Sequence, residues 1–164
     1  MSPRPEHEVA KKAAARLIEL LAFVRGITLQ SFGSRTFRRE DAGRGLEPDE
    51  CYYVADAQRV AGTTEFDPQR DPPPEIVVEI DITRRSIERE PIYASLGVKE
   101  IWRFDGRNLR VLELGAGGVY EPRDGSRVFP FLPMDRFGQF MLRMMRERNV
   151  QQVLEEFAAW VRTL

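Results

Sequence analysis

The stretch Ile76-Val77-Val78-Glu79-Ile80-Asp81-Ile82 decides the fold. Its apolar residues are nearly continuous, which is typical of a central strand that is covered on both faces of a sheet. Two carboxylates, Glu79 and Asp81, interrupt the far end of this strand, and a spacing of two residues places them on the same face. A buried carboxylate is costly unless it is paired, hydrogen-bonded or bound to a cation. The stretch therefore predicts a central strand whose far end is a candidate site for chemistry.

The segments on either side of this strand predict helices and short strands around it. Apolar residues at three- and four-residue spacing from Pro5 to Arg25 indicate an amphipathic helix that ends at Gly26. The stretches 27–32 and 35–38 are interpreted as two strands joined by a tight turn. The other expected elements are, in chain order, a Gly-rich loop over 41–48, a strand over 51–55, a surface excursion over 61–74, a short helix over 86–96, a hairpin of strands over 100–104 and 109–114, a strand over 119–121, and helices from about Met134 with a break near Asn149. This order predicts an α/β fold with a mixed central β-sheet flanked by helices, in a single domain over residues 1–164.

Length and composition exclude several kinds of protein. The chain has 164 residues, of which 42% are hydrophobic and 31% charged, as expected of a soluble globular domain. No apolar run approaches the roughly 20 residues of a membrane span, and the first residues lack the apolar core of a signal peptide, so we expect a cytoplasmic protein without a membrane partner. The single cysteine, Cys51, and the single histidine, His7, exclude a thiolate metal cage and a site that needs two imidazoles.

Basic and acidic residues are nearly balanced, at 25 against 26, so bulk charge gives no reason to expect binding to nucleic acid. The basic residues are 22 arginines and only three lysines, Lys11, Lys12 and Lys99. A compositional bias of the genome explains the excess of arginine most simply, although arginine is also well suited to contacts with phosphate. Any mechanism that needs a lysine must use one of these three.

Carboxylates at the ends of apolar strands form the candidate site. Asp49 precedes the expected strand at Cys51, and two neighbouring strands would bring Asp49 close to Glu79. With the backbone carbonyl of Ile80, the two acids would supply hard oxygen ligands for Mg²⁺. Such a metal ion activates water and neutralises charge on a phosphodiester. The spacing alone leaves open the alternative that these carboxylates only pair with arginines.

Several stretches resemble the Uma-two family of endonuclease-like proteins, which belongs to the restriction-endonuclease-like PD-(D/E)XK superfamily. They are residues 45–54, 72–83 and 91–106, and the opening residues 1–8 resemble the family's segment before its first helix. The resemblance runs from residue 1 to about residue 135. It implies a restriction-endonuclease-like fold and a Mg²⁺-dependent endonuclease, with Mn²⁺ as a substitute, that hydrolyses phosphodiester bonds of DNA.

Carried over by position, the resemblance implies that Asp49 is the first metal-binding acid and Glu79 the second. Asp81 falls where the superfamily signature has its lysine. In the family this lysine has moved to the following helix, four residues before a tyrosine that here is Tyr93, and the corresponding residue of this chain is Arg89. An arginine can hold a phosphate, but its pKa above about 12 makes it a poor general base. The predicted catalytic residues are therefore Asp49, Glu79, Asp81 and Arg89.

The departure at Arg89 leaves two other functions open. One is a relative that binds nucleic acid or regulates another protein but has lost turnover with the lysine. The other is a structural dimerisation module without a nucleic-acid partner. Family members also carry an upstream segment that ends in a strand, whereas this chain begins at the motif that follows it. Either the start of the chain is assigned too late or the protein lacks this edge strand. A missing edge strand would leave its neighbour open, and we therefore expect a homodimer.

Three further features each have two interpretations. His7 resembles a recurrent histidine of the family, but a lone histidine at this position is more often a helix cap or a surface group. Two pairs of arginines either line a phosphate-binding cleft or are solvated, and they are Arg38 with Arg39 and Arg84 with Arg85. The apolar residues of the C-terminal region form either core or a dimer face, and they are Phe137, Phe140, Met141, Met144 and Met145.

Overall fold

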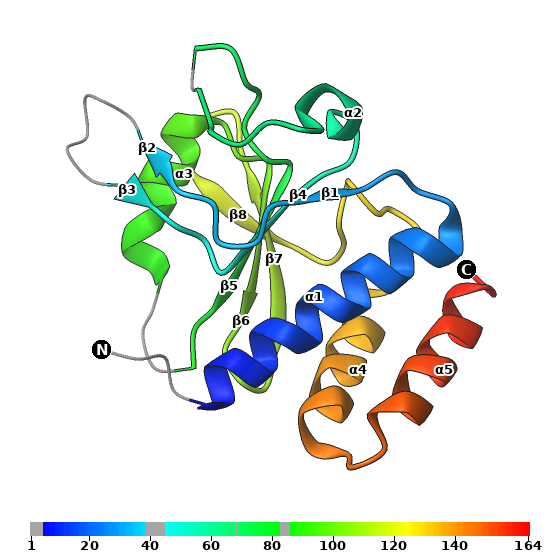
Figure 1. The fold of residues 1–164 in the computed structure, drawn as a ribbon. Coiled ribbons are helices and arrows are strands. Elements are labelled where there is room, and N and C mark those ends of the chain that lie inside the picture. Colours follow the sequence, from blue (N-terminus) through cyan, green and yellow to red (C-terminus); the bar gives the residue numbers. More distant parts are fainter. Residues whose placement is uncertain (1–4, 39–44, 68, 83–85) are drawn as a thin grey trace.

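A six-stranded mixed sheet forms the centre of the fold in the computed structural model, which describes residues 5–38, 45–67, 69–82 and 86–164 (Figure 1). The strands in spatial order are β1 (Gln30–Ser31), β4 (Glu50–Tyr53), β5 (Ile76–Ile80), β6 (Glu100–Phe104), β7 (Leu109–Leu114) and β8 (Tyr120–Arg123). Only β5 and β6 are parallel, and the other neighbours are antiparallel. The α/β class with a mixed sheet, predicted from the order of elements, is confirmed.

Three long helices cover one face of the sheet. They are α1 (Pro5–Arg25), α4 (Met134–Arg146) and α5 (Val150–Val161), which contact one another and lie side by side in Figure 1. The opposite face is covered by α3 (Glu90–Leu96), which continues from the 3₁₀ turn η2 (Ser86–Arg89). No helix of the described part of the chain is long and apolar enough to cross a membrane.

The central strand β5 is buried on both faces, as its sequence predicts. Ile76, Val78 and Ile80 point into the larger core beneath α1, α4 and α5. Val77 points to the other face, where it belongs to the cluster that contains Tyr93 of α3. Because side chains alternate along a strand, Glu79 shares the face of Val77 and lies on the side of α3.

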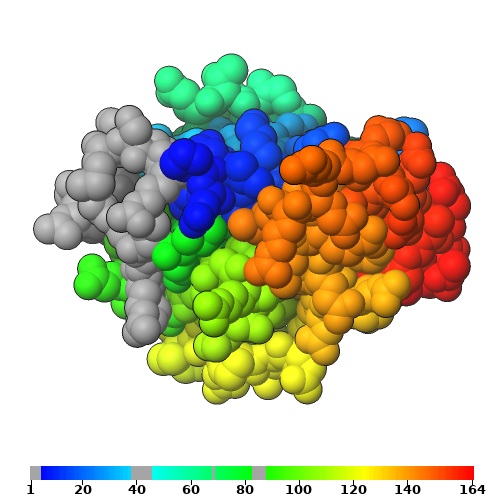
Figure 2. Space-filling view, turned by 90° about the horizontal axis from the view of Figure 1, so that it is seen from below, coloured from blue at the N-terminus to red at the C-terminus, as the bar shows by residue number. Residues whose placement is uncertain are grey.

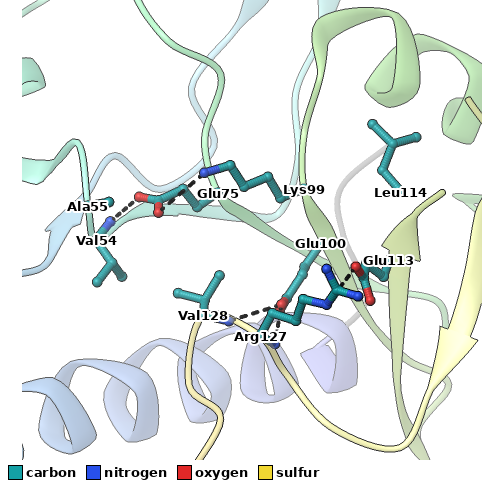
Figure 3. Close-up of a pocket in the computed structure, with 9 residues that line it drawn as sticks. All are labelled: Val54, Ala55, Glu75, Lys99, Glu100, Glu113, Leu114, Arg127 and Val128. Carbon is teal, nitrogen blue, oxygen red and sulfur yellow. Dashed lines mark hydrogen bonds and ion pairs between the residues drawn. The ribbon is translucent and has the colours of Figure 1, made fainter. Parts of the chain in front are cut away.

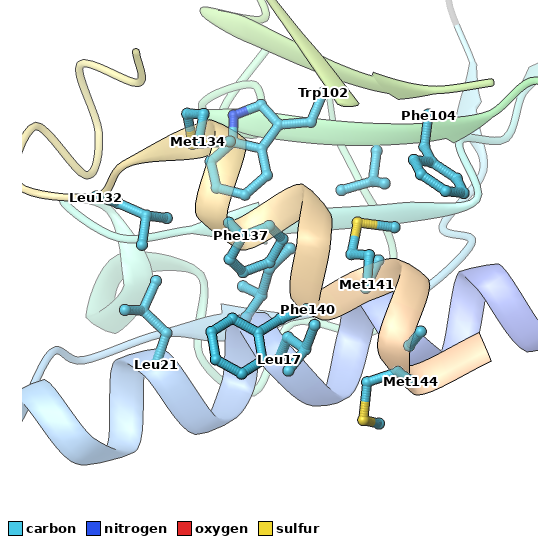
Figure 4. Packing of buried hydrophobic residues seen from close by; sticks show 14 of the residues in the cluster. Leu17, Leu21, Trp102, Phe104, Leu132, Met134, Phe137, Phe140, Met141 and Met144 are labelled. Atoms are coloured by element: carbon cyan, nitrogen blue, oxygen red, sulfur yellow. The ribbon is translucent and has the colours of Figure 1, made fainter. Parts of the chain in front are cut away.

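Aromatic residues from the C-terminal half fill the larger core (Figure 4). Trp102 of β6 meets Phe137 of α4 edge to face, with ring centroids 5.5 Å apart. Phe140 and Phe157, from the two C-terminal helices, are in similar contact at 5.1 Å. Phe137, Phe140, Met141 and Met144 are all buried and Met145 is half-buried, so the C-terminal cluster is core of the chain itself.

The prediction of a hairpin between residues 27–32 and 35–38 is wrong. The two short strands do not pair with each other: β1 pairs with β4, and β2 (Phe37–Arg38) pairs with β3 (Gly45–Leu46), within the expected Gly-rich loop. The aromatic residues on the two sides of Gly33 explain the difference. Phe32 packs edge-on against Tyr53, whereas Phe37 packs against Phe66. The short helix α2 (Ala57–Val60) was also not expected.

The helix α3 ends at Gly97, which adopts the left-handed conformation with φ of 80°. A β-carbon at this position would lie 3.6 Å from Pro73, an ordinary contact, so the cost of adding one is conformational. We therefore expect Gly97→Ala to lower the free energy of unfolding by about 1 kcal/mol. Urea denaturation measures this, with Gly117→Ala as the matched control, because Gly117 has open space and no positive φ. Equal effects of the two substitutions would contradict the prediction.

Candidate active site

Asp49 directly precedes β4 and Glu79 lies in the neighbouring strand β5, at the same end of the sheet. Strand β4 is antiparallel to β5, with Glu50 opposite Val78, so the next pair along this register is Asp49 and Glu79. The Oδ2 atom of Asp49 accepts a hydrogen bond of 2.7 Å from the backbone N–H of Ile80. The structure thus brings the two predicted metal-binding acids together, and their roles remain predictions.

Glu79 is the most deeply buried carboxylate of this site, with only 2% of its surface exposed. The Nη1 atom of Arg89 lies 3.1 Å from each of its two oxygens, and the hydroxyl of Tyr93 donates to Oε1. Burial raises the pKa of Glu79 to about 7, and Asp49 acts in the same direction, while Tyr93 and Arg89 act against it. A carboxyl group that titrates near neutral pH beside a second acid is typical of functional sites.

Arg89 points into the acidic site. Its Nη1 atom donates to Glu79 and also to the backbone carbonyl of Glu47, at 3.2 Å. Arg89 ends the 3₁₀ turn, and Tyr93 follows one helical turn later, so that both side chains reach the same carboxylate. The structure therefore places the predicted residue Arg89 at the site and adds Tyr93, which the sequence had marked only as a reference position.

His7 also belongs to this site. It lies in the first turns of α1, and its Nε2 atom is 3.1 Å from Oδ1 of Asp49. The side chain is 17% exposed. In Figure 2 the first turns of α1 (dark blue) border both the green residues of the middle of the chain and the orange helix α4. Of the two interpretations of His7, the contact with Asp49 supports the site residue.

Asp81 forms an ion pair with Arg103 of β6, in which the Nε atom of Arg103 is 3.0 Å from Oδ2. The Nη1 atom of Arg103 in turn contacts Glu90 of α3 at 2.7 Å. Asp81 thus helps to connect the end of β5 with β6 and α3. Nothing in this geometry gives Asp81 the role of the signature lysine, and its predicted catalytic role remains a prediction.

The donor atoms of the site suit a hard divalent cation, but they are engaged with protein groups. Mg²⁺ prefers carboxylate and carbonyl oxygens, which Asp49, Glu79 and the backbone of Ile80 can supply. Among the described residues, however, no three His, Cys, Asp or Glu side chains are grouped so as to hold a metal ion. The residues therefore fit Mg²⁺ through two carboxylates, a backbone oxygen and water, provided that Arg89 gives up part of its contact with Glu79.

The predicted phosphate-binding arginines cannot be placed. Arg39, Arg84 and Arg85 lie outside the described residues, as does the side chain of Arg38. Lys11 and Lys12 lie on α1, and both act electrostatically on Glu50, the neighbour of Asp49. Burial is the largest influence on Glu50 and raises its pKa. The two lysines therefore contribute positive charge at Glu50 and have no described contact with Glu79.

A pocket of about 550 Å³ lies at the opposite end of the sheet, where β5 and β6 begin and β4 and β7 end (Figure 3). It is lined by Val54, Ala55, Glu75, Lys99, Glu100, Glu113, Leu114, Arg127 and Val128. The ammonium group of Lys99 is 3.9 Å from Glu75. Lys99 is therefore at the wrong end of the sheet to replace the lysine that the family pattern expects near Glu79.

Comparison with known proteins agrees with this fold. Residues 1–138 match the model of the Uma2 (Uma-two) family, whose description is "Putative restriction endonuclease". A solved structure described as "a putative nuclease belonging to DUF820", from Anabaena variabilis, has a TM-score of 0.61 and 12% sequence identity. The similarity covers 88% of this chain and 84% of that chain, and at this identity it shows a shared fold. A comparison with curated protein sequences found no match.

Proposed function

Because this chain belongs to the Uma2 family, we propose that it is a Mg²⁺-dependent endonuclease that hydrolyses phosphodiester bonds of DNA at the site formed by Asp49 and Glu79. The observation that carries the proposal is the meeting of these two acids at the same end of adjacent strands, one just before β4 and the other in β5, where Glu79 is buried and its pKa is raised to about 7. Ion pairing for stability alone would favour a lowered pKa of such a carboxylate.

The residues of the site have separable roles in this proposal. Asp49 and Glu79, with the carbonyl of Ile80, would hold the metal ion, which when bound supplies an activated water and neutralises charge on the phosphate. The N–H of Ile80 and the imidazole of His7 fix the orientation of the Asp49 carboxylate. Arg89 carries a permanent positive charge that can stabilise negative charge on a phosphate oxygen.

Metal-dependent nicking of supercoiled plasmid DNA tests the proposal. We expect nicking by the intact chain with Mg²⁺ or Mn²⁺, none with EDTA, and none by an Asp49→Asn variant. Circular dichroism verifies that the variant is folded. Cleavage that persists in EDTA, or that is equal in both proteins, would overturn the assignment.

A second candidate is a relative that binds nucleic acid without turnover, and the contact between Arg89 and Glu79 favours it. A guanidinium cannot accept a proton at working pH, and here it is bound to one of the two essential acids. Cleavage gained by an Arg89→Lys variant would support this candidate. Strong cleavage by the unaltered protein would exclude it.

The other expectations from the sequence remain predictions. The same proposal includes a homodimer, a cytoplasmic location and a single domain over residues 1–164. Sedimentation velocity tests the dimer. Salt-dependent DNA binding tests the third candidate, a structural module without a nucleic-acid partner, because phosphate contacts weaken as salt rises.

A further inference from the structure

Two donors with different freedom of movement hold Glu79. Tyr93 has no exposed surface and packs in the cluster that includes Val77 and Ile101, so its hydroxyl cannot leave without opening the core. Arg89 has 44% of its side chain exposed and reaches the site from the 3₁₀ turn. Its guanidinium can therefore turn to solvent at little cost in packing.

The position of Arg89 conflicts with a cation bound at the same carboxylate. Its Nη1 atom is 3.1 Å from each of the two oxygens of Glu79, so a metal ion that coordinates Glu79 has to compete with Arg89 for these oxygens. Two cations beside one carboxylate also repel each other strongly at a buried site. Tyr93 is neutral and donates to only one of the oxygens, which leaves the carboxylate able to coordinate through the other.

We propose that Arg89 and the divalent cation exchange at Glu79, so that Arg89 occupies the carboxylate without metal and is released when the cation binds, while Tyr93 orients Glu79 in both states. The inference rests on the proposed function, because it needs a cation at this site. The exchange would be a physical consequence of having an arginine, Arg89, where the family pattern expects a lysine. The protein carries an internal cation that competes with the metal, and Arg89 is set free beside the phosphate only when the metal is bound.

Binding of Mn²⁺ tests the exchange without any measurement of cleavage. Electron paramagnetic resonance counts free Mn²⁺ during titration of the intact chain and of the variants Arg89→Met, Tyr93→Phe and Lys12→Met. We expect Arg89→Met to bind Mn²⁺ roughly tenfold more tightly, because a competing charge-assisted contact is removed. Tyr93→Phe is expected to bind roughly tenfold more weakly, because the carboxylate loses its orienting partner.

Lys12→Met is the matched control for charge. Lys12 lies on α1, acts electrostatically on Glu50, the neighbour of Asp49, and has no described contact with Glu79, so its loss removes one positive charge without removing a competitor. We expect it to change the Mn²⁺ affinity by less than about twofold, because an exposed charge is screened by solvent. An equal gain for Lys12→Met and Arg89→Met would show that general electrostatics, and not exchange at Glu79, governs the affinity.

The remaining outcomes separate the two proposals. Binding by the intact chain that is lost in Asp49→Asn but unchanged in Arg89→Met would overturn the exchange and leave the proposed function standing. Binding by neither the intact chain nor Arg89→Met would overturn both. Binding by Arg89→Met alone would be the strongest support for the exchange. If Arg89→Met does not fold, Arg89→Gln provides the same comparison.

Discussion

A Glu79→Gln variant is expected to be more stable than the unaltered protein at pH 8 in EDTA, and to have lost its cleavage activity. The gain in stability follows from the raised pKa of Glu79, which burial shifts from 4.5 to about 7. At pH 8 the folded protein holds this carboxylate ionised although its surroundings favour the neutral form. Glutamine has nearly the same shape and no charge, and Arg89 is exposed enough to turn to solvent when it loses its partner.

The sign of the pH dependence follows from the two pKa values. Between about pH 4.5 and pH 7 the folded protein binds more protons at Glu79 than the unfolded chain does. The contribution of this group to stability is therefore fully present below pH 4.5 and is lost as the pH rises through 7. Above that range the ionised group costs on the order of 3 kcal/mol, since each pKa unit corresponds to about 1.4 kcal/mol. The variant lacks this dependence.

Urea denaturation at pH 4.5 and pH 8 in EDTA measures the effect. We expect the two proteins to be nearly equal in stability at pH 4.5, and the variant to be more stable by about 1 to 3 kcal/mol at pH 8. At saturating Mg²⁺ the nicking rate of the variant should fall by about a hundredfold or more, because one of the two acids that hold the metal is removed. A variant that is less stable at both pH values would show that Glu79 contributes to the fold instead.

The parts of the fold that the sequence predicts correctly depend on local patterns. The apolar run of β5, the spacing of α1 and the turn between β6 and β7 each carry their own signal over consecutive residues. The choice of partner strand for β1 and for β2 depends on contacts with residues that are distant in the sequence. Phe32 and Phe37 pack against Tyr53 and Phe66, and no pattern within residues 27–38 specifies these partners.

In the candidate site, too, some features follow from the sequence and others depend on contacts between distant residues. The order of strands and the family resemblance are sufficient to place Asp49 beside Glu79. The partners of these acids depend on how α1 and α3 are oriented on the sheet, and this depends on packing across the whole core. The contacts of His7 with Asp49 and of Tyr93 with Glu79 could not be derived from spacing for this reason. The resemblance to family positions was the only signal for either residue.

A second buried glutamate, Glu100, allows a test of the difference between a structural and a functional carboxylate. It is 1% exposed, and its carboxylate accepts four hydrogen bonds. Trp102 Nε1 and the Ser126 hydroxyl donate to Oε2, while the backbone N–H groups of Arg127 and Val128 donate to Oε1. Glu100 thus attaches the segment that precedes α4 to the start of β6.

Replacing Glu100 with leucine is expected to lower the free energy of unfolding by about 4 kcal/mol, because buried donors lose their acceptor and leucine offers none in its place. The loss of stability for Glu100→Gln should lie between zero and the loss for Glu100→Leu, since the glutamine amide keeps one of the two acceptor oxygens. Urea denaturation monitored by tryptophan fluorescence measures both, with Glu121→Gln as the control, because Glu121 is 59% exposed and pairs only with Arg123 among its described contacts. A loss below about 1 kcal/mol for Glu100→Leu would mean that water reaches these donors through the adjoining pocket.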